Sequence, residues 1–223
     1  MLEIICMNVE DAKTVQECGA DRIELVSALT EGGLTPSYAM IENVVKAVDI
    51  PVNVMIRPHA NSFVYSKEDL DVMVKDIEIA KELGVNGVVL CVLDNENNIN
   101  EEHLNLLLEK CDGLDVTFHK AIEETNLIKS MNILNKYKKI TTVLTAGGKD
   151  KIENNIDKIN DMKLYSGNID ILLGGGLNFD NIREIQKLTN NTSYHFGTAV
   201  RVENSPFKKI DKDKLKELVE IIK

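Results

Sequence analysis

Short apolar runs alternate with longer amphipathic segments along the whole chain. The runs are rich in β-branched residues and predict eight strands, at residues 2–6, 22–26, 52–56, 87–92, 116–119, 142–145, 169–173 and 193–196. The segments between them repeat apolar residues every three or four positions, as in Leu70, Met73, Ile77 and Ala80 after a capping-box-like Ser66. Strand starts recur roughly every 27 residues, the size of one βα unit.

This alternation predicts a parallel sheet, because a parallel connection must cross a face of the sheet and usually does so as a helix. Eight βα units within 223 residues fit a closed barrel. We therefore expect an α/β protein with a single (β/α)8 TIM-barrel domain over residues 1–223. The alternative is an open, doubly wound sheet, and it is disfavoured because no G-x-G-x-x-G motif follows the first strand.

Charge and composition narrow the classes of partner. The formal net charge is −10 and the chain has no Trp, so neither nucleic acid nor an anionic membrane is expected as a partner. No run approaches the ~18 apolar residues of a membrane span. The first residues do not resemble a secretory signal, and the four cysteines contain no C-x-x-C pair. A cytoplasmic location is expected.

Three polar residues should face the interior of the barrel near the C-terminal ends of their strands. Side chains alternate along a strand, so turning the apolar neighbours toward the helices turns Glu24, Arg57 and His119 inward. The same alternation points Lys120 outward, and Thr145 ends the sixth strand. One interpretation is a structural Glu24–Arg57 ion pair. The favoured one is a catalytic site for an anion or carbonyl, because such positions usually serve the ligand in this fold.

Glycine-rich turns after the last three strands are candidates for anion binding. The turns contain Gly147, Gly148, Gly174, Gly175, Gly176 and Gly197, and His195 lies on the last strand. Loops after the seventh and eighth strands often hold phosphate in barrels, although the glycines could serve only as tight turns. The long segment 57–65 could cover the site as a lid.

Six motifs in order along the chain resemble those of the CutC family. They are GADRIEL at 19–25, EGGLTPS at 31–37, VMIRP at 54–58, FVYS at 63–66, TFHKA at 117–121 and GGG at 174–176. The resemblance implies a barrel, a cytoplasmic location and a link to copper homeostasis, without an established reaction. By the resemblance alone, Cu(I) is also a candidate cofactor.

The residues themselves argue against that copper site. The resemblance implies that copper-linked members carry cysteines at the positions of Ile5 and Val26, which should both face inward. Cu(I) prefers thiolates or thioethers, and here both positions hold branched hydrocarbons. Cys6 is one place away and should face the helices. No metal ligand is therefore assigned.

Three hypotheses remain at this point. The chain could be an enzyme that performs acid–base chemistry on a small anionic or phosphorylated metabolite. It could be a copper-binding protein, as the resemblance implies. It could also be a non-catalytic barrel that acts through partners. In each case a homo-oligomer, dimer or tetramer, is expected.

Overall fold

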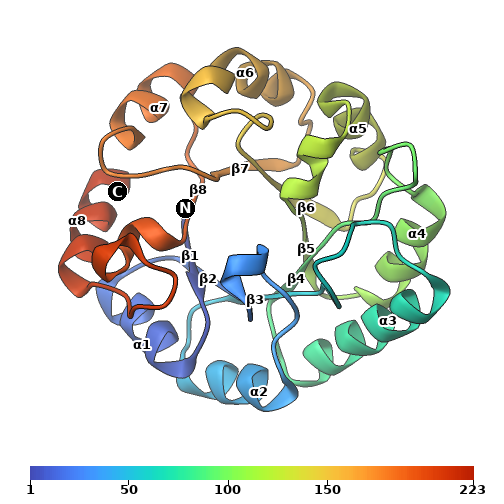
Figure 1. Cartoon of the computed structure of the whole chain (residues 1–223), viewed down its shortest axis with the longest axis horizontal. Coiled ribbons are helices and arrows are strands. Elements are labelled where there is room, and N and C mark those ends of the chain that lie inside the picture. Colours follow the sequence, from blue (N-terminus) through green and yellow to red (C-terminus); the bar gives the residue numbers. More distant parts are fainter.

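The computed structural model describes residues 1–223 and forms a closed barrel of parallel strands in sequence order, with β1 pairing β8 to close the ring (Figure 1). The single (β/α)8 barrel predicted from the sequence is confirmed. The strands are β1 Leu2–Cys6, β2 Arg22–Leu25, β3 Val52–Met55, β4 Gly87–Leu90, β5 Asp115–Phe118, β6 Ile140–Thr145, β7 Asp170–Gly174 and β8 Tyr194–Phe196.

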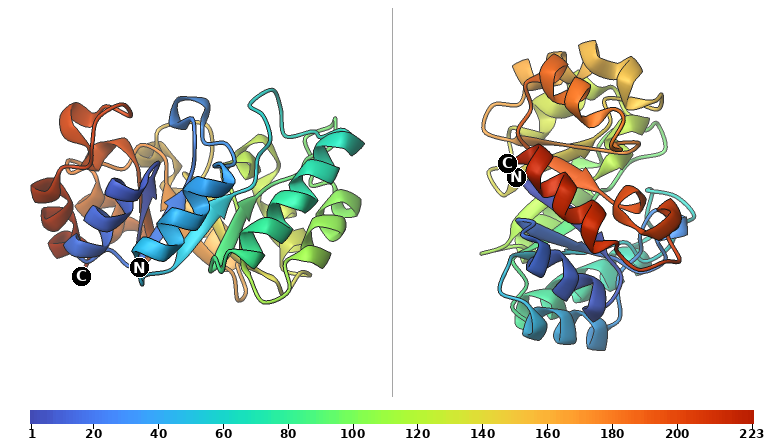
Figure 2. Two further views of the ribbon diagram at one scale, coloured as in Figure 1. Left: turned by 90° about the horizontal axis from the view of Figure 1, so that it is seen from below. Right: turned by 90° about the vertical axis from the view of Figure 1, so that its left-hand side faces the viewer.

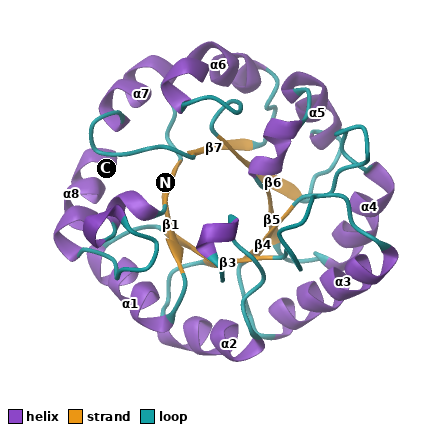
Figure 3. Ribbon diagram, viewed as in Figure 1, coloured by secondary structure: helices purple, strands orange, loops and turns teal.

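A ring of helices surrounds the strands (Figure 3). They are α1 Val9–Cys18, α2 Tyr38–Ala47, α3 Lys67–Glu82, α4 Glu101–Lys110, α5 Leu127–Leu134, α6 Ile156–Leu164, α7 Ile182–Thr189 and α8 Lys212–Ile222. Local sequence fixes several of their starts. Asn8 and Ser37 accept a hydrogen bond from the backbone of the first turn of α1 and α2, and Ser66 forms a capping box with Asp69 at α3.

The main hydrophobic core lies between the strands and the helices. It is one cluster of 54 buried residues and includes Ile23 and Leu25, the two side chains expected on the outer face of β2. A second, small cluster of Val26, Met55 and Val89 lies apart from it. The predicted alternation on β2 and β3 is therefore confirmed.

Loops that follow the strands gather at one end of the barrel. Figure 2 shows the segments after β2 and β3 rising above the rim at that end. The segment after β2 contains a short 3-10 helix, η1 Leu29–Glu31, which lies over the barrel opening in Figure 3. No helix is both long and apolar enough to cross a bilayer. This end of the barrel is where the functional side chains meet.

Candidate functional site

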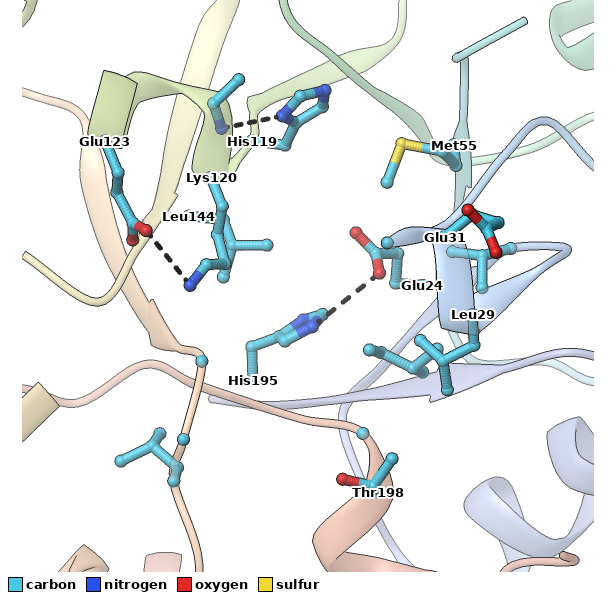
Figure 4. A pocket seen from close by; sticks show the side chains of 18 of the residues that line it. Glu24, Leu29, Glu31, Met55, His119, Lys120, Glu123, Leu144, His195 and Thr198 are labelled. Atoms are coloured by element: carbon cyan, nitrogen blue, oxygen red, sulfur yellow. Dashed lines mark hydrogen bonds and ion pairs between the residues drawn. The ribbon is translucent and has the colours of Figure 1, made fainter. Parts of the chain in front are cut away.

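A cavity of about 660 Å³ opens at the C-terminal end of the strands. Its size falls within the range of small-molecule sites. One side is apolar and comes from β1 to β3 and the loop after β2, with Ile5, Val26, Leu29 and Met55. Glu24 and His195 lie between this side and the opposite one, which carries Lys120 (Figure 4).

Glu24 and His195 face each other across the barrel interior. Oε2 of Glu24 lies 3.8 Å from Nε2 of His195, and both side chains are almost fully buried. Oε1 of Glu24 has no hydrogen-bond partner. A buried carboxyl oxygen without a partner is costly, so its presence beside a cavity suits a group that meets a ligand.

His195 is held in place by a second carboxylate that the sequence analysis did not include in the site. Oε1 of Glu3 lies 2.7 Å from Nδ1 of His195, and its Oε2 accepts a 2.5 Å hydrogen bond from Nε of Arg22. The same alternation that points Ile5 inward also points Glu3 inward, two residues deeper, so the signal was present. Its partners come from β2, the next strand, and from β8, which only closure of the ring brings beside β1.

Burial and charge tune the proton affinities of these groups. The pKa of Glu24 is raised to about 7, mainly by burial and also by the Glu3 carboxylate, while His195 and Arg22 oppose the rise. Burial works against protonation of His195, but Glu24 and Glu3 raise its pKa above the usual value. Burial also works against the charged form of Glu3, yet Arg22 and His195 keep its pKa low. The pair Glu24–His195 can therefore exchange protons near neutral pH.

His119 lines the same cavity but is held neutral. Its Nδ1 accepts a 3.1 Å hydrogen bond from the backbone N–H of Ala121, so the proton of the neutral ring resides on Nε2. Burial, and then the positive charge of Arg57, lower the pKa of His119 to about 3. Nε2 is buried without a partner, and the ring of Phe63 lies 5.3 Å away between centroids. His119 is thus suited to donate a hydrogen bond, not to carry charge.

Arg57 lines the cavity as expected, but one nitrogen of its guanidinium, Nη1, is committed to the backbone, while the buried Nε has no partner. Nη1 donates to the carbonyl oxygens of Glu31 (2.7 Å) and Gly33 (3.1 Å), and the group lies 4.9 Å from the centroid of the Phe63 ring. No ion pair joins Arg57 to Glu24, so the structural pair considered from the sequence is absent. Arg57 holds the loop after β2 over the cavity instead, which also brings the EGGLTPS motif into the site through Glu31.

Lys120 corrects a prediction made from strand alternation. It was expected to point outward, yet it lines the cavity, with Nζ 3.2 Å from Oε2 of Glu123 (Figure 4). The reason is that β5 ends at Phe118 and the chain then turns into a 3-10 helix, η2 Lys120–Glu124. Alternation applies only while the chain is extended.

The other predicted site residues divide into two groups. Gly175, Gly176 and Gly197 line the cavity, whereas Thr145, Gly147, Gly148 and Gly174 do not.

The four residues that do not line the cavity have the following surroundings. Oγ1 of Thr145 donates to Oε1 of Glu123 at 3.2 Å and accepts from the N–H of Gly147, so these two residues support the carboxylate that pairs with Lys120. Gly174 leaves room for His195, since a Cβ there would lie 2.9 Å from its ring. Gly148 lines a different surface depression.

The donor set does not fit Cu(I). No cysteine lines the cavity; Cys6 and Cys91 belong to the main core, and burial raises the pKa of both thiols. Ile5 and Val26 line the cavity where the resemblance implies cysteines. Glu3, Glu24 and His195 have ligand atoms within 4.8 Å of one another, but Glu3 is already bonded to Arg22 and His195. The two free donors left are too few for a structural metal site and are not the soft ligands of Cu(I).

Comparisons with known proteins identify the family. A CutC relative from Enterobacter sp. (strain 638) is 37% identical over 82% of this chain and 74% of its own length. One from Pasteurella multocida is 34% identical over 92% of this chain and 85% of its own length.

Comparison with solved structures supports the same family. The crystal structure of Streptococcus agalactiae CutC, whose name assigns it to copper homeostasis, has a TM-score of 0.84 at 32% identity, covering 89% of this chain and 98% of that one. Phosphoribosylanthranilate isomerase from Thermotoga maritima shares the fold alone, with a TM-score of 0.62 at 17% identity over 99% of this chain and 97% of that one. The family model described as "CutC family" matches residues 1–200, and the chain belongs to the CutC family.

Proposed function

We propose that this protein is an enzyme that moves a proton on a small anionic metabolite, next to a carbonyl group. The observation that carries the proposal is the Glu24–His195 contact of 3.8 Å, made by two buried groups beside a cavity of about 660 Å³. A structural ion pair would satisfy its oxygens, whereas Oε1 of Glu24 has no partner.

Glu24 is the general base in this proposal. A pKa near the working pH gives a base that is partly deprotonated and still takes up a proton readily. With a pKa raised to about 7, Glu24 meets that condition, and an ordinary glutamate would not. His195 relays or stores the proton, since its Nδ1 is oriented by Glu3 while Nε2 faces Glu24.

His119 supplies the second half of the chemistry. Taking a proton from carbon beside a carbonyl places negative charge on the carbonyl oxygen, and a neutral imidazole N–H can stabilise that oxygen. The bond from Ala121 to Nδ1 keeps the remaining proton on Nε2. The ring of Phe63, in the segment after β3, lies 5.3 Å from the His119 ring between centroids, so this segment borders the donor.

A copper-handling role, suggested by the name of the S. agalactiae relative, is not favoured by any feature of the cavity. Cu(I) needs several thiolates or thioethers, and the cavity offers only the thioether of Met55.

Deuterium incorporation tests the proposed reaction. Small carbonyl metabolites, with and without phosphate, are screened for thermal stabilisation of the protein, and those that bind are incubated in D₂O and followed by proton NMR. We expect wild-type protein to exchange a C–H proton of at least one binder and Glu24→Gln to slow that exchange by at least about 100-fold. Equal exchange rates for wild type and Glu24→Gln would refute the proposal.

Self-association and a cytoplasmic location stay predictions. Light scattering of the purified chain tests the first, with a dimer or tetramer as the expected size. Fractionation of cells tests the second.

A further inference from the structure

The side of the cavity opposite the apolar wall carries an unusual concentration of uncommitted hydrogen-bond donors. Gly175, Gly176 and Leu177 line the cavity after β7, and none of their backbone N–H groups has an acceptor within the protein. The N–H groups of Gly197 and Thr198 after β8 are also unpaired, but Gly197 lies beside the apolar wall, where a Cβ would be 2.8 Å from Ile5. Leu177 is buried and Gly175 is half-buried. Backbone N–H groups away from water are nearly always paired in folded proteins, so the consecutive unpaired donors after β7 are available to an external acceptor.

Lys120 reaches the donors of the loop after β7. A Cβ added at Gly175 would lie 2.2 Å from Nζ of Lys120, so the ammonium occupies the space that a side chain there would need. Gly175 and Gly176 both have positive φ, at 95° and 87°, a conformation that glycine adopts without strain and that leaves the backbone N–H groups of this turn free of side-chain cover. The glycines therefore make room for the Lys120 ammonium and leave the backbone N–H groups accessible, which a tight turn alone does not require.

Glu123 fixes the ammonium without occupying all of it. Its Oε2 lies 3.2 Å from Nζ, and its Oε1 is held by Thr145 and by the backbone of Ala146. An ammonium has three donors, so the two not directed at Glu123 remain for a ligand. Arg57 also lines the cavity, but its Nη1 bonds to backbone carbonyls and its guanidinium lies toward Phe63.

We infer that Lys120, with the backbone donors of the loop after β7, binds a phosphate group of the substrate. The inference rests on the proposed function and names its substrate class: a phosphate monoester of a small carbonyl compound. The phosphate lies by Lys120 and Gly175, the reacting carbon by Glu24, and the remainder of the molecule lies against the wall formed by Ile5, Val26 and Met55.

Titration with inorganic phosphate, followed by the amide signals of ¹⁵N-labelled full-length protein, tests the inference. Sodium chloride at equal ionic strength is the control for general salt effects. We expect saturable shifts of the Gly175, Gly176 and Leu177 signals in wild-type protein. Lys120→Met should weaken phosphate binding at least about tenfold, and Lys120→Arg should restore part of it. Lys149→Met is the matched control, because Lys149 is an exposed lysine paired with Glu124 and should leave binding unchanged.

Two results would overturn the inference: shifts at these amides that do not saturate, or phosphate affinity in Lys120→Met equal to that of wild type. The outcome is separable from that of the proposed function, because Glu24→Gln should bind phosphate as wild type does. Phosphate binding without any C–H exchange would refute the proposed reaction alone. Glu24-dependent exchange in a compound without phosphate, combined with no phosphate binding, would refute the phosphate site alone.

Discussion

Nε2 of His195 faces Oε2 of Glu24 at 3.8 Å, while the other nitrogen of the ring is held by Glu3. This relationship makes His195 the link between a carboxylate that stays charged and a carboxyl that titrates near neutrality. The two glutamates lie on adjacent strands and the histidine on the strand that closes the ring. The closed barrel is therefore a requirement of the site.

Replacing Glu24 should change how stability depends on pH. A carboxyl whose pKa is raised on folding stabilises the folded state below its unfolded pKa, and this contribution is lost as pH rises through the folded value of about 7. Glu24→Gln has no such loss. Urea unfolding should find the variant gaining stability relative to wild type between pH 5 and pH 8, by up to about 3 kcal/mol. A difference that is independent of pH would contradict the raised pKa.

Replacing Glu3 should be costly, because it leaves the buried end of Arg22 without its partner and frees the His195 ring. Breaking a buried pair on one side costs about 3–5 kcal/mol. We expect Glu3→Gln to lose about that much in denaturant unfolding and to lower the pKa of His195. Glu42→Gln removes an exposed ion pair with Lys46 and is the control, with an expected change within about 0.5 kcal/mol. Similar losses for the two variants would argue against the Glu3 network.

The two cavity histidines should behave oppositely in an NMR titration of the ring nitrogens. His119 should remain neutral, with its proton on Nε2, from pH 8 down to at least about pH 4.5, because burial and Arg57 lower its pKa to about 3. His195 should become protonated at a higher pH than an ordinary histidine does, because its pKa is raised. The depressed pKa of His119 also means that its contribution to stability is lost as pH falls below about 6.5 toward 3. Titration of His119 near pH 6.5 would contradict its assignment as a neutral donor.

Copper binding should require residues that this chain lacks. In anaerobic titration against a strong Cu(I) chelator, we expect wild-type protein to take no stoichiometric copper, because its cavity holds no thiol. The double variant Ile5→Cys/Val26→Cys places two thiols in the cavity and should compete for one Cu(I), while Ile5→Cys alone should compete poorly. Stoichiometric binding by the wild-type chain would show that copper is held in a way this cavity does not explain.

Strand periodicity was sufficient to predict the barrel and the convergence of Glu24, Arg57 and His119 on one cavity, because the inner face of a strand is set by alternation alone. It failed at Lys120, one residue beyond the point where the chain stops being extended. It also could not assign the partners of Arg57, which are carbonyl oxygens of a loop whose conformation depends on tertiary contacts.

The predicted strand ends were less accurate than the strands themselves. β4 ends at Leu90 instead of Val92, and β6 begins at Ile140, two residues before its predicted start. Such shifts are expected, because the last residues of a strand are defined by pairing with neighbours and not by their own pattern. The shifts matter for function only where a site residue lies at a strand end, as at His119.

The most direct test of the account is an NMR titration of the glutamate side-chain carboxyl carbons, with Glu24→Gln used for assignment. The account predicts one carboxyl with a midpoint near pH 7 that disappears in the variant. If every glutamate in the wild-type protein titrated below about pH 5, as ordinary glutamates do, Glu24 could not serve as the base proposed here.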